Sequence, residues 1–93
     1  MITYLLTYKL ESEEKRNAFL SELRQNKADV ISRAEDGCIK YSYYLPCDDS
    51  KSLLLVEMWE SEAHQKKHTT QPHFKIIQEL KQKYNVTTEC DSL

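Results

Sequence analysis

The chain has 93 residues, of which 40% are hydrophobic and 30% charged, and this balance predicts one small globular domain over residues 1–93. A formal net charge of -2 excludes nucleic acids and anionic membranes as expected partners. No apolar run approaches the ~20 residues that span a bilayer, and no signal peptide opens the chain, so we expect a cytoplasmic protein with no membrane partner.

The first part of the chain predicts a strand followed by a long helix. Side chains alternate over residues 2–10 with the period of a strand. Ser12 can cap the next segment, in which apolar residues recur at helical spacing. They predict one helix of about six turns, with an inner stripe of Phe19, Leu20, Leu23, Val30 and Ala34. Glu35-Asp36-Gly37, which contains the only glycine, ends this helix.

The remaining segments predict a hairpin, two further helices and a last strand. Residues 38–45 form a strand with one face made of Ile39, Tyr41, Tyr43 and Leu45. After a turn, residues 53–60 form its hairpin partner, which is apolar on both faces except at Glu57. We expect a short polar helix over 62–67, a longer one over 72–84 and a strand over 85–90.

This order of elements predicts an α+β fold of the ferredoxin-like split βαβ type, with an antiparallel sheet and helices on one face. The strands offer large apolar side chains on both faces. An exposed apolar sheet face of that size is typical of an interface. We therefore expect a homodimer packed sheet to sheet.

Candidate functional residues gather where the strand that contains Glu57 and Trp59 meets the following helices. His68 is a candidate general base, because an imidazole can take and give a proton near neutral pH. The alternative is a partly exposed helix-end imidazole that bonds a carbonyl. The helix dipole favours neutral His73, which suits a hydrogen bond to a carbonyl, or else His73 caps the turn after Thr70.

Three further residues can have either a functional or a purely structural role. Trp59 can form a flat wall against an aromatic substrate or belong to the core. Tyr41 can line the same pocket or pack in the core. Glu57 interrupts an apolar strand, so we expect it to receive hydrogen bonds from backbone or tyrosine hydroxyl groups.

We expect no metal and no disulfide. His64 and His68 lie four residues apart, a spacing that suits a metal, but HQKKH lacks a glutamate and is cationic. Cys38, Cys47 and Cys90 are odd in number and lack CxxC spacing, which favours free thiols.

Three segments resemble a known family: EDGCIKY at residues 35–41, EMWES at 57–61, and His68 followed by PHF at 72–74. They are similar to the antibiotic biosynthesis monooxygenase domain, from residue 1 to about residue 90. The resemblance implies a ferredoxin-like dimeric α+β barrel. Asp36 stands where the family usually has proline. Residues 5–7 lack the asparagine that the haem-degrading branch uses, so the resemblance does not imply haem.

The resemblance implies a small cofactor-independent monooxygenase that acts on a quinol, an anthrone or a similar enolisable small molecule. His68 and Trp59 would be its catalytic residues, and the substrate would be bound by Tyr41, His73, Phe74 and Glu57. No flavin motif is present, and we expect no cofactor. The family is mixed in chemistry, so an isomerase of a small carbonyl compound and a non-catalytic dimeric ligand-binding module stay open.

Overall fold

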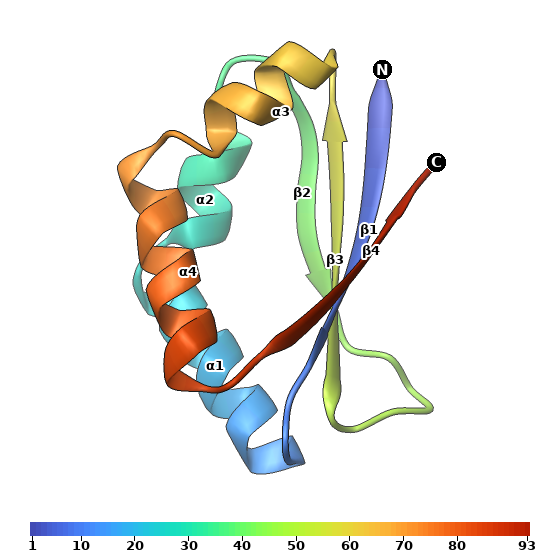
Figure 1. The fold of residues 1–93 in the computed structure, drawn as a ribbon, viewed down its shortest axis with the longest axis vertical. Helices are drawn as coiled ribbons and strands as arrows, with labels where there is room; N and C mark the ends of the chain where they lie inside the picture. The colour runs from blue at the N-terminus through green and yellow to red at the C-terminus, as the bar shows by residue number, and fades with distance from the viewer.

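The computed structural model describes residues 1–93 as two layers, with all helices on one side of an antiparallel sheet (Figure 1). The elements in chain order are β1 (Ile2–Lys9), α1 (Glu13–Gln25), α2 (Ala28–Arg33), β2 (Cys38–Tyr44), β3 (Ser52–Trp59), α3 (Glu62–His68), α4 (Pro72–Lys83) and β4 (Thr87–Ser92). The strand order is β2-β3-β1-β4. This is the ferredoxin-like arrangement, and the predicted fold class is confirmed.

The central strand β3 separates the two faces of the sheet. From Leu53 onward its helix-facing side chains are buried, whereas the alternate ones are partly exposed on the open face, as the period of two requires. The buried set is Leu53, Leu55, Glu57 and Trp59, and the open set is Leu54, Val56 and Met58. The core therefore lies between the sheet and the helices, and an apolar row remains on the other side.

The predicted six-turn helix is two helices, and this prediction was wrong. Asn26 ends α1 with its side-chain amide donating to the Glu22 carbonyl, and Lys27 adopts a left-handed conformation with φ of 56°. The break rotates the apolar face of the following turns. Ala28 is consequently buried, whereas Val30 is 52% exposed, so Val30 leaves the predicted inner stripe.

The second strand contains a bulge that the alternation pattern did not predict. Cys38 and Lys40 face neighbouring residues of β3, so Ile39 is the additional residue between them. Ile39 is exposed as a result, and Leu45, beyond the end of the strand, is exposed too. Tyr41 is buried, as expected of a residue on the inner face.

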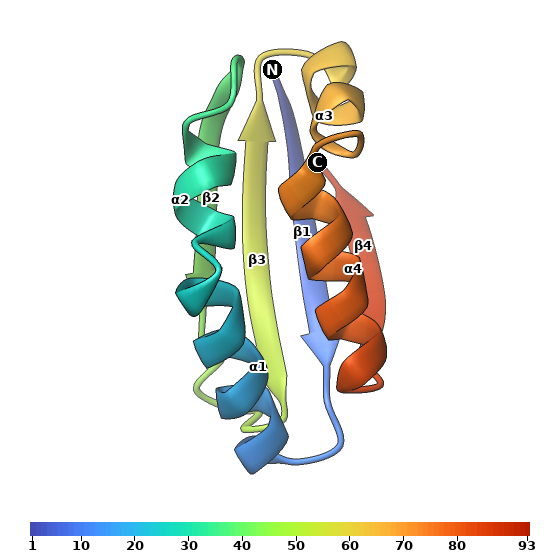
Figure 2. The same ribbon diagram turned by 90° about the vertical axis from the view of Figure 1, so that its left-hand side faces the viewer.

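Local signals place the two helices that carry the histidines. Ser61 caps α3 by accepting a hydrogen bond from the His64 amide at 3.3 Å, and Pro72 occupies the first turn of α4. Figure 2 shows the helices in two columns over the sheet, α1 with α2 and α3 with α4. His68 ends α3 and His73 lies in the first turn of α4, so the turn between these helices brings the two imidazoles close together.

The last strand begins two residues later than predicted, at Thr87, because Asn85 has a φ of 53° and belongs to the turn after α4. No helix combines the length and the apolar character needed to cross a membrane.

Candidate functional site

The side chain of His68 lies at the centre of an aromatic cluster between the sheet and the helices. Its ring centroid is 5.0 Å from that of Trp59, 5.5 Å from that of Tyr41 and 5.3 Å from that of Phe74. The His73 ring lies 5.5 Å away. The structure thus brings together five of the six side chains that the sequence singled out, from β2, β3, α3 and α4.

The sixth residue, Glu57, joins the cluster through Trp59. Its Oε1 accepts a hydrogen bond from the indole Nε1–H of Trp59 at 3.0 Å. Residues two apart on a strand share a face, so this bond is local to β3. The expected partners, backbone and tyrosine hydroxyls, were wrong. Burial raises the pKa of Glu57, although the Trp59 hydrogen bond acts in the opposite direction.

Glu35 completes the site. The sequence reading placed it in the turn after the long helix and in a segment that resembles the family, but did not name it as a site residue. Its Oε2 accepts from His68 Nδ1–H at 2.5 Å and from His73 Nε2–H at 2.8 Å. The His68 side chain is 2% exposed, that of His73 8% and that of Glu35 14%. An acidic residue before an Asp-Gly turn carries no signal that would distinguish it from a solvated one.

This hydrogen bonding assigns the imidazole tautomers. An ionised carboxylate only accepts hydrogen bonds, so each nitrogen that faces Glu35 carries a proton. A neutral imidazole with its proton on Nδ1 has an unprotonated Nε2, and Nδ1 is the His68 nitrogen that faces Glu35. A carboxylate that orients an imidazole and leaves its other nitrogen free is the arrangement of a general base.

The burial of His68 corrects one expectation. A partly exposed imidazole at a helix end was predicted, but the ring is enclosed by aromatic side chains and by Glu35. His64, which the sequence paired with His68 as a weak metal motif, instead lies 2.7 Å from the Ser61 hydroxyl through Nδ1. The ligand atoms that lie within 4.8 Å of one another belong to Glu35, His68 and His73.

Two hollows open on the surface. The first, of about 520 Å³, lies between α2 and α4 and is lined by Ile31, Ala34, Glu35, Gln71, Pro72, His73 and Ile76. We call it the α2–α4 groove. Trp59, Tyr41 and His68 do not line it, so Glu35 and His73 form its contact with the buried cluster.

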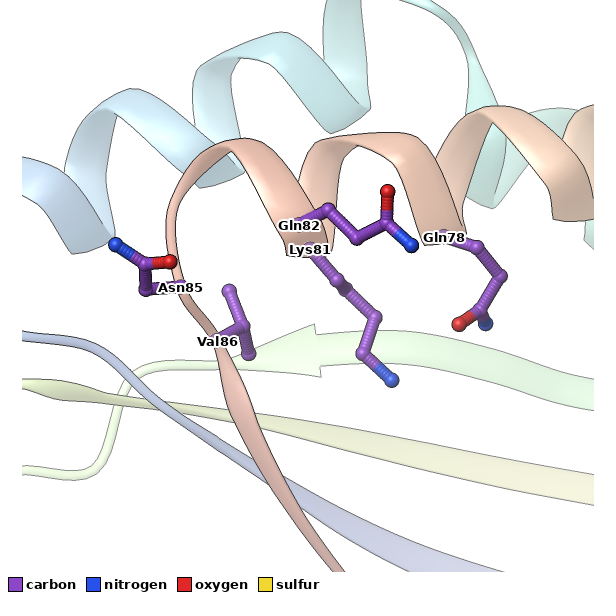
Figure 3. A pocket seen from close by; sticks show the side chains of 5 residues that line it. All are labelled: Gln78, Lys81, Gln82, Asn85 and Val86. Atoms are coloured by element: carbon purple, nitrogen blue, oxygen red, sulfur yellow. The ribbon is translucent and has the colours of Figure 1, made fainter.

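The second hollow, of about 530 Å³, lies where α4 turns into β4 (Figure 3) and is lined by Gln78, Lys81, Gln82, Asn85 and Val86. Lys81 extends from α4 toward the sheet, and its Nζ lies 5.1 Å from the ring centroid of Tyr8. Burial lowers the pKa of Lys81. None of the predicted site residues lines this hollow.

Solved structures share this fold. A candidate antibiotic biosynthesis monooxygenase from Nitrosomonas europaea superposes with a TM-score of 0.87 at 15% identity, over 100% of this chain and 96% of the other. One from Deinococcus radiodurans gives 0.81 at 21% identity, over 100% and 90% of the two chains. A protein from Pseudomonas aeruginosa gives 0.78 at 24% identity, over 99% and 91%. At these identities the likeness concerns the fold.

A comparison with curated protein sequences finds no match. A family model described as antibiotic biosynthesis monooxygenase matches residues 1–80, and this segment contains every residue of the buried cluster. The chain therefore belongs to the antibiotic biosynthesis monooxygenase family.

Proposed function

We propose that this protein is a small cofactor-independent monooxygenase that acts on a quinol, an anthrone or a similar enolisable small molecule. The observation that carries the proposal is the 2.5 Å hydrogen bond between Glu35 and His68 inside an aromatic enclosure. The family description supports oxygen chemistry, and the hydrogen bond supplies the oriented base that such chemistry needs.

In the proposed reaction, His68 Nε2 takes a proton from the enol or phenol group of the substrate. Glu35 stabilises the imidazolium that forms, as a carboxylate does beside a catalytic histidine. The electron-rich substrate anion then reduces O₂ and bonds to it. For an anthrone CH₂ group, the resulting peroxide collapses to a carbonyl group and water, so one oxygen atom enters the product and the other leaves as water.

The surrounding side chains would hold the substrate. Trp59, Tyr41 and Phe74 would stack against a flat ring and exclude water from the anion. His73 and Glu57 would bond the polar ends of the substrate. His68 is almost fully buried, so the proposal includes a movement of α3 away from the sheet that admits the substrate to Nε2.

We also propose that the chain acts as a homodimer packed through the open face of the sheet. Leu5, Leu54, Val56 and Met58 leave a partly exposed apolar surface there. The helices all lie on the other side of the sheet (Figure 1). A domain of this size gains from burying such a surface. The unpaired cysteines favour a reducing compartment, such as the cytoplasm, as its location.

Oxygen uptake with a panel of quinols and anthrones tests the proposal. We expect uptake by the native chain, a loss of ~10²-fold or more in Glu35→Gln, and no change in His64→Ala, which alters another histidine of α3. Exchange of substrate protons into deuterated water without uptake would favour the isomerase instead. Ligand binding with neither signal would favour the non-catalytic module.

A further inference from the structure

We propose that Glu35, His68 and His73 form a binding site for one divalent transition-metal ion of the Zn²⁺ type. Two imidazoles and one carboxylate are the ligand set that Zn²⁺ takes in open sites, with a water molecule as fourth ligand. The sequence offered only His64 and His68, without a third ligand. The inference goes beyond the proposed oxygenation, and ion binding itself does not depend on it.

The three ligand atoms converge from three separate parts of the chain. Glu35 follows α2, His68 ends α3 and His73 is the second residue of α4. Glu35 Oε2, His68 Nδ1 and His73 Nε2 all lie within 4.8 Å of one another. Because tertiary packing holds all three in place, the ordering of ligands that usually opposes metal binding is largely complete before the ion arrives.

A bound ion would lengthen the two distances from the Glu35 carboxylate to the imidazoles, and the imidazole nitrogens lie within 4.8 Å of each other. Zn²⁺ lies about 2.0 to 2.2 Å from N and O ligands, which puts tetrahedral ligand atoms about 3.3 Å apart. The carboxylate oxygen is 2.5 Å from one imidazole nitrogen and 2.8 Å from the other. The Glu35 carboxylate would therefore withdraw by less than about 1 Å. Glu35 belongs to a turn, where a side-chain shift does not disturb helical hydrogen bonds.

The α2–α4 groove provides the path for the ion and the place for its water ligand. Glu35 and His73 both line this groove, whose remaining walls are mainly apolar. An ion that enters there meets Glu35 and His73, which line the groove, before His68, which does not. His64 and Asp36 form the other histidine–acid pair of α3, at 3.7 Å, but they supply only two ligands and Asp36 is exposed.

Ion binding and base catalysis exclude one another, a consequence that rests on the proposed function. An ion on His68 Nδ1 displaces the proton from that nitrogen, and the neutral ring then carries its proton on Nε2. Nε2 is the nitrogen that the proposed reaction uses as a base. The ion would therefore inhibit oxygen uptake.

Calorimetric titration of tag-free protein with ZnCl₂ tests the site. We expect one ion per chain, an affinity lowered at least ~10-fold in His73→Asn and Glu35→Gln, and unchanged affinity in His64→Asn. Circular dichroism checks that each variant is folded. No binding by the native chain, or an affinity that falls in His64→Asn but not in His73→Asn, would overturn the proposal.

Co²⁺ provides a second measurement on the native chain if a variant fails to fold. Tetrahedral nitrogen and oxygen ligation gives Co²⁺ intense visible bands, and equimolar Zn²⁺ should remove them. A spectrum identical to that of aqueous Co²⁺ would contradict the site. Because no substrate is present, failure of every quinol in the oxygen assay would leave this result unaffected.

Discussion

Glu35 Oε2 lies 2.5 Å from His68 Nδ1, although the two residues are 33 positions apart in the chain. The same oxygen accepts a second hydrogen bond from His73. A turn, the end of one helix and the start of another are thereby connected through one carboxylate oxygen. The His68 ring, held at Nδ1, packs against the rings of Trp59, Tyr41 and Phe74.

The role of His68 can be separated from its contribution to packing. In His68→Asn the side-chain amide N–H can replace Nδ1–H as a donor to Glu35, whereas the basic Nε2 is lost. We expect a folded protein with oxygen uptake reduced ~10²- to 10⁴-fold. Trp59→Ala should lose activity and also lower the free energy of unfolding by ~3 to 5 kcal/mol, because it leaves a cavity in the core.

Urea unfolding and oxygen uptake, measured on both variants, decide between these roles. Activity loss that follows the unfolded fraction equally in both would mean that His68 is structural only.

The buried charge of Glu57 makes stability depend on pH. Burial raises the folded-state pKa of Glu57 above its ordinary value, so its stabilising contribution is full at acid pH and is lost as pH rises through that folded pKa. Glu57→Gln keeps an acceptor for the Trp59 indole and removes the charge. The variant should therefore melt at a higher temperature than the native chain at pH 7, and the difference should shrink below about pH 4.5, the unfolded value.

Melting curves at matched ionic strength from pH 4 to 8 check this prediction. If the difference in melting temperature between Glu57→Gln and the native chain grew as the pH fell, the prediction would be wrong.

Gly37 permits the turn that positions Glu35. Its φ is 79°, and an added Cβ would lie 2.3 Å from the His64 ring. We expect Gly37→Ala to lower the free energy of unfolding by ~1 to 3 kcal/mol, because alanine disfavours the left-handed backbone and its Cβ would clash with α3. In a double-mutant cycle, His64→Ala should recover part of this cost. Strictly additive effects in chemical denaturation would exclude the clash.

The open face of the sheet should be the dimer interface. Val56 lies on this face in the central strand β3, so Val56→Lys would place a charge within the proposed contact. We expect sedimentation to show a dimer for the native chain at micromolar concentration and a monomer for the variant. Val30→Lys, on the exposed side of α2, is the matched control and should remain dimeric. A native chain that sediments as a stable monomer would refute this interface.

The three thiols should react at different rates. Burial, together with the charges of Glu35 and Glu57, raises the pKa of the Cys38 thiol to about 11, so it contains almost no thiolate at neutral pH. Cys47 is exposed. Cys90 is exposed as a residue too, but partial burial of its thiol group raises the pKa of that thiol.

A disulfide reagent at pH 7.5 should therefore modify Cys47 first, then Cys90, and Cys38 only after denaturation. Cys47→Ser should remove the fastest phase. If that phase persisted in the variant, the assignment would be wrong.

The local pattern of the sequence determined the elements and their order. Alternation along 2–10 and the apolar run along 53–60 predicted strands, and Ser12 and Pro72 predicted helix starts. These signals depend only on residues that are close together in the sequence, so they can be recognised before the fold is known. The spacing of Trp59, His68 and Phe74 likewise indicated the corner at which the aromatic cluster forms.

Tertiary structure decided the break at Lys27, the bulge at Ile39 and the partner of His68. The packing of the flanking elements selects the left-handed conformation of Lys27 and the extra strand residue Ile39. Neither feature can be predicted from the spacing of apolar residues. Glu35 differs from any other acidic turn residue only because the fold places two imidazoles against it. Burial in that contact excludes water and makes the hydrogen bonds strong, and this physical condition exists only once the sheet and helices have packed.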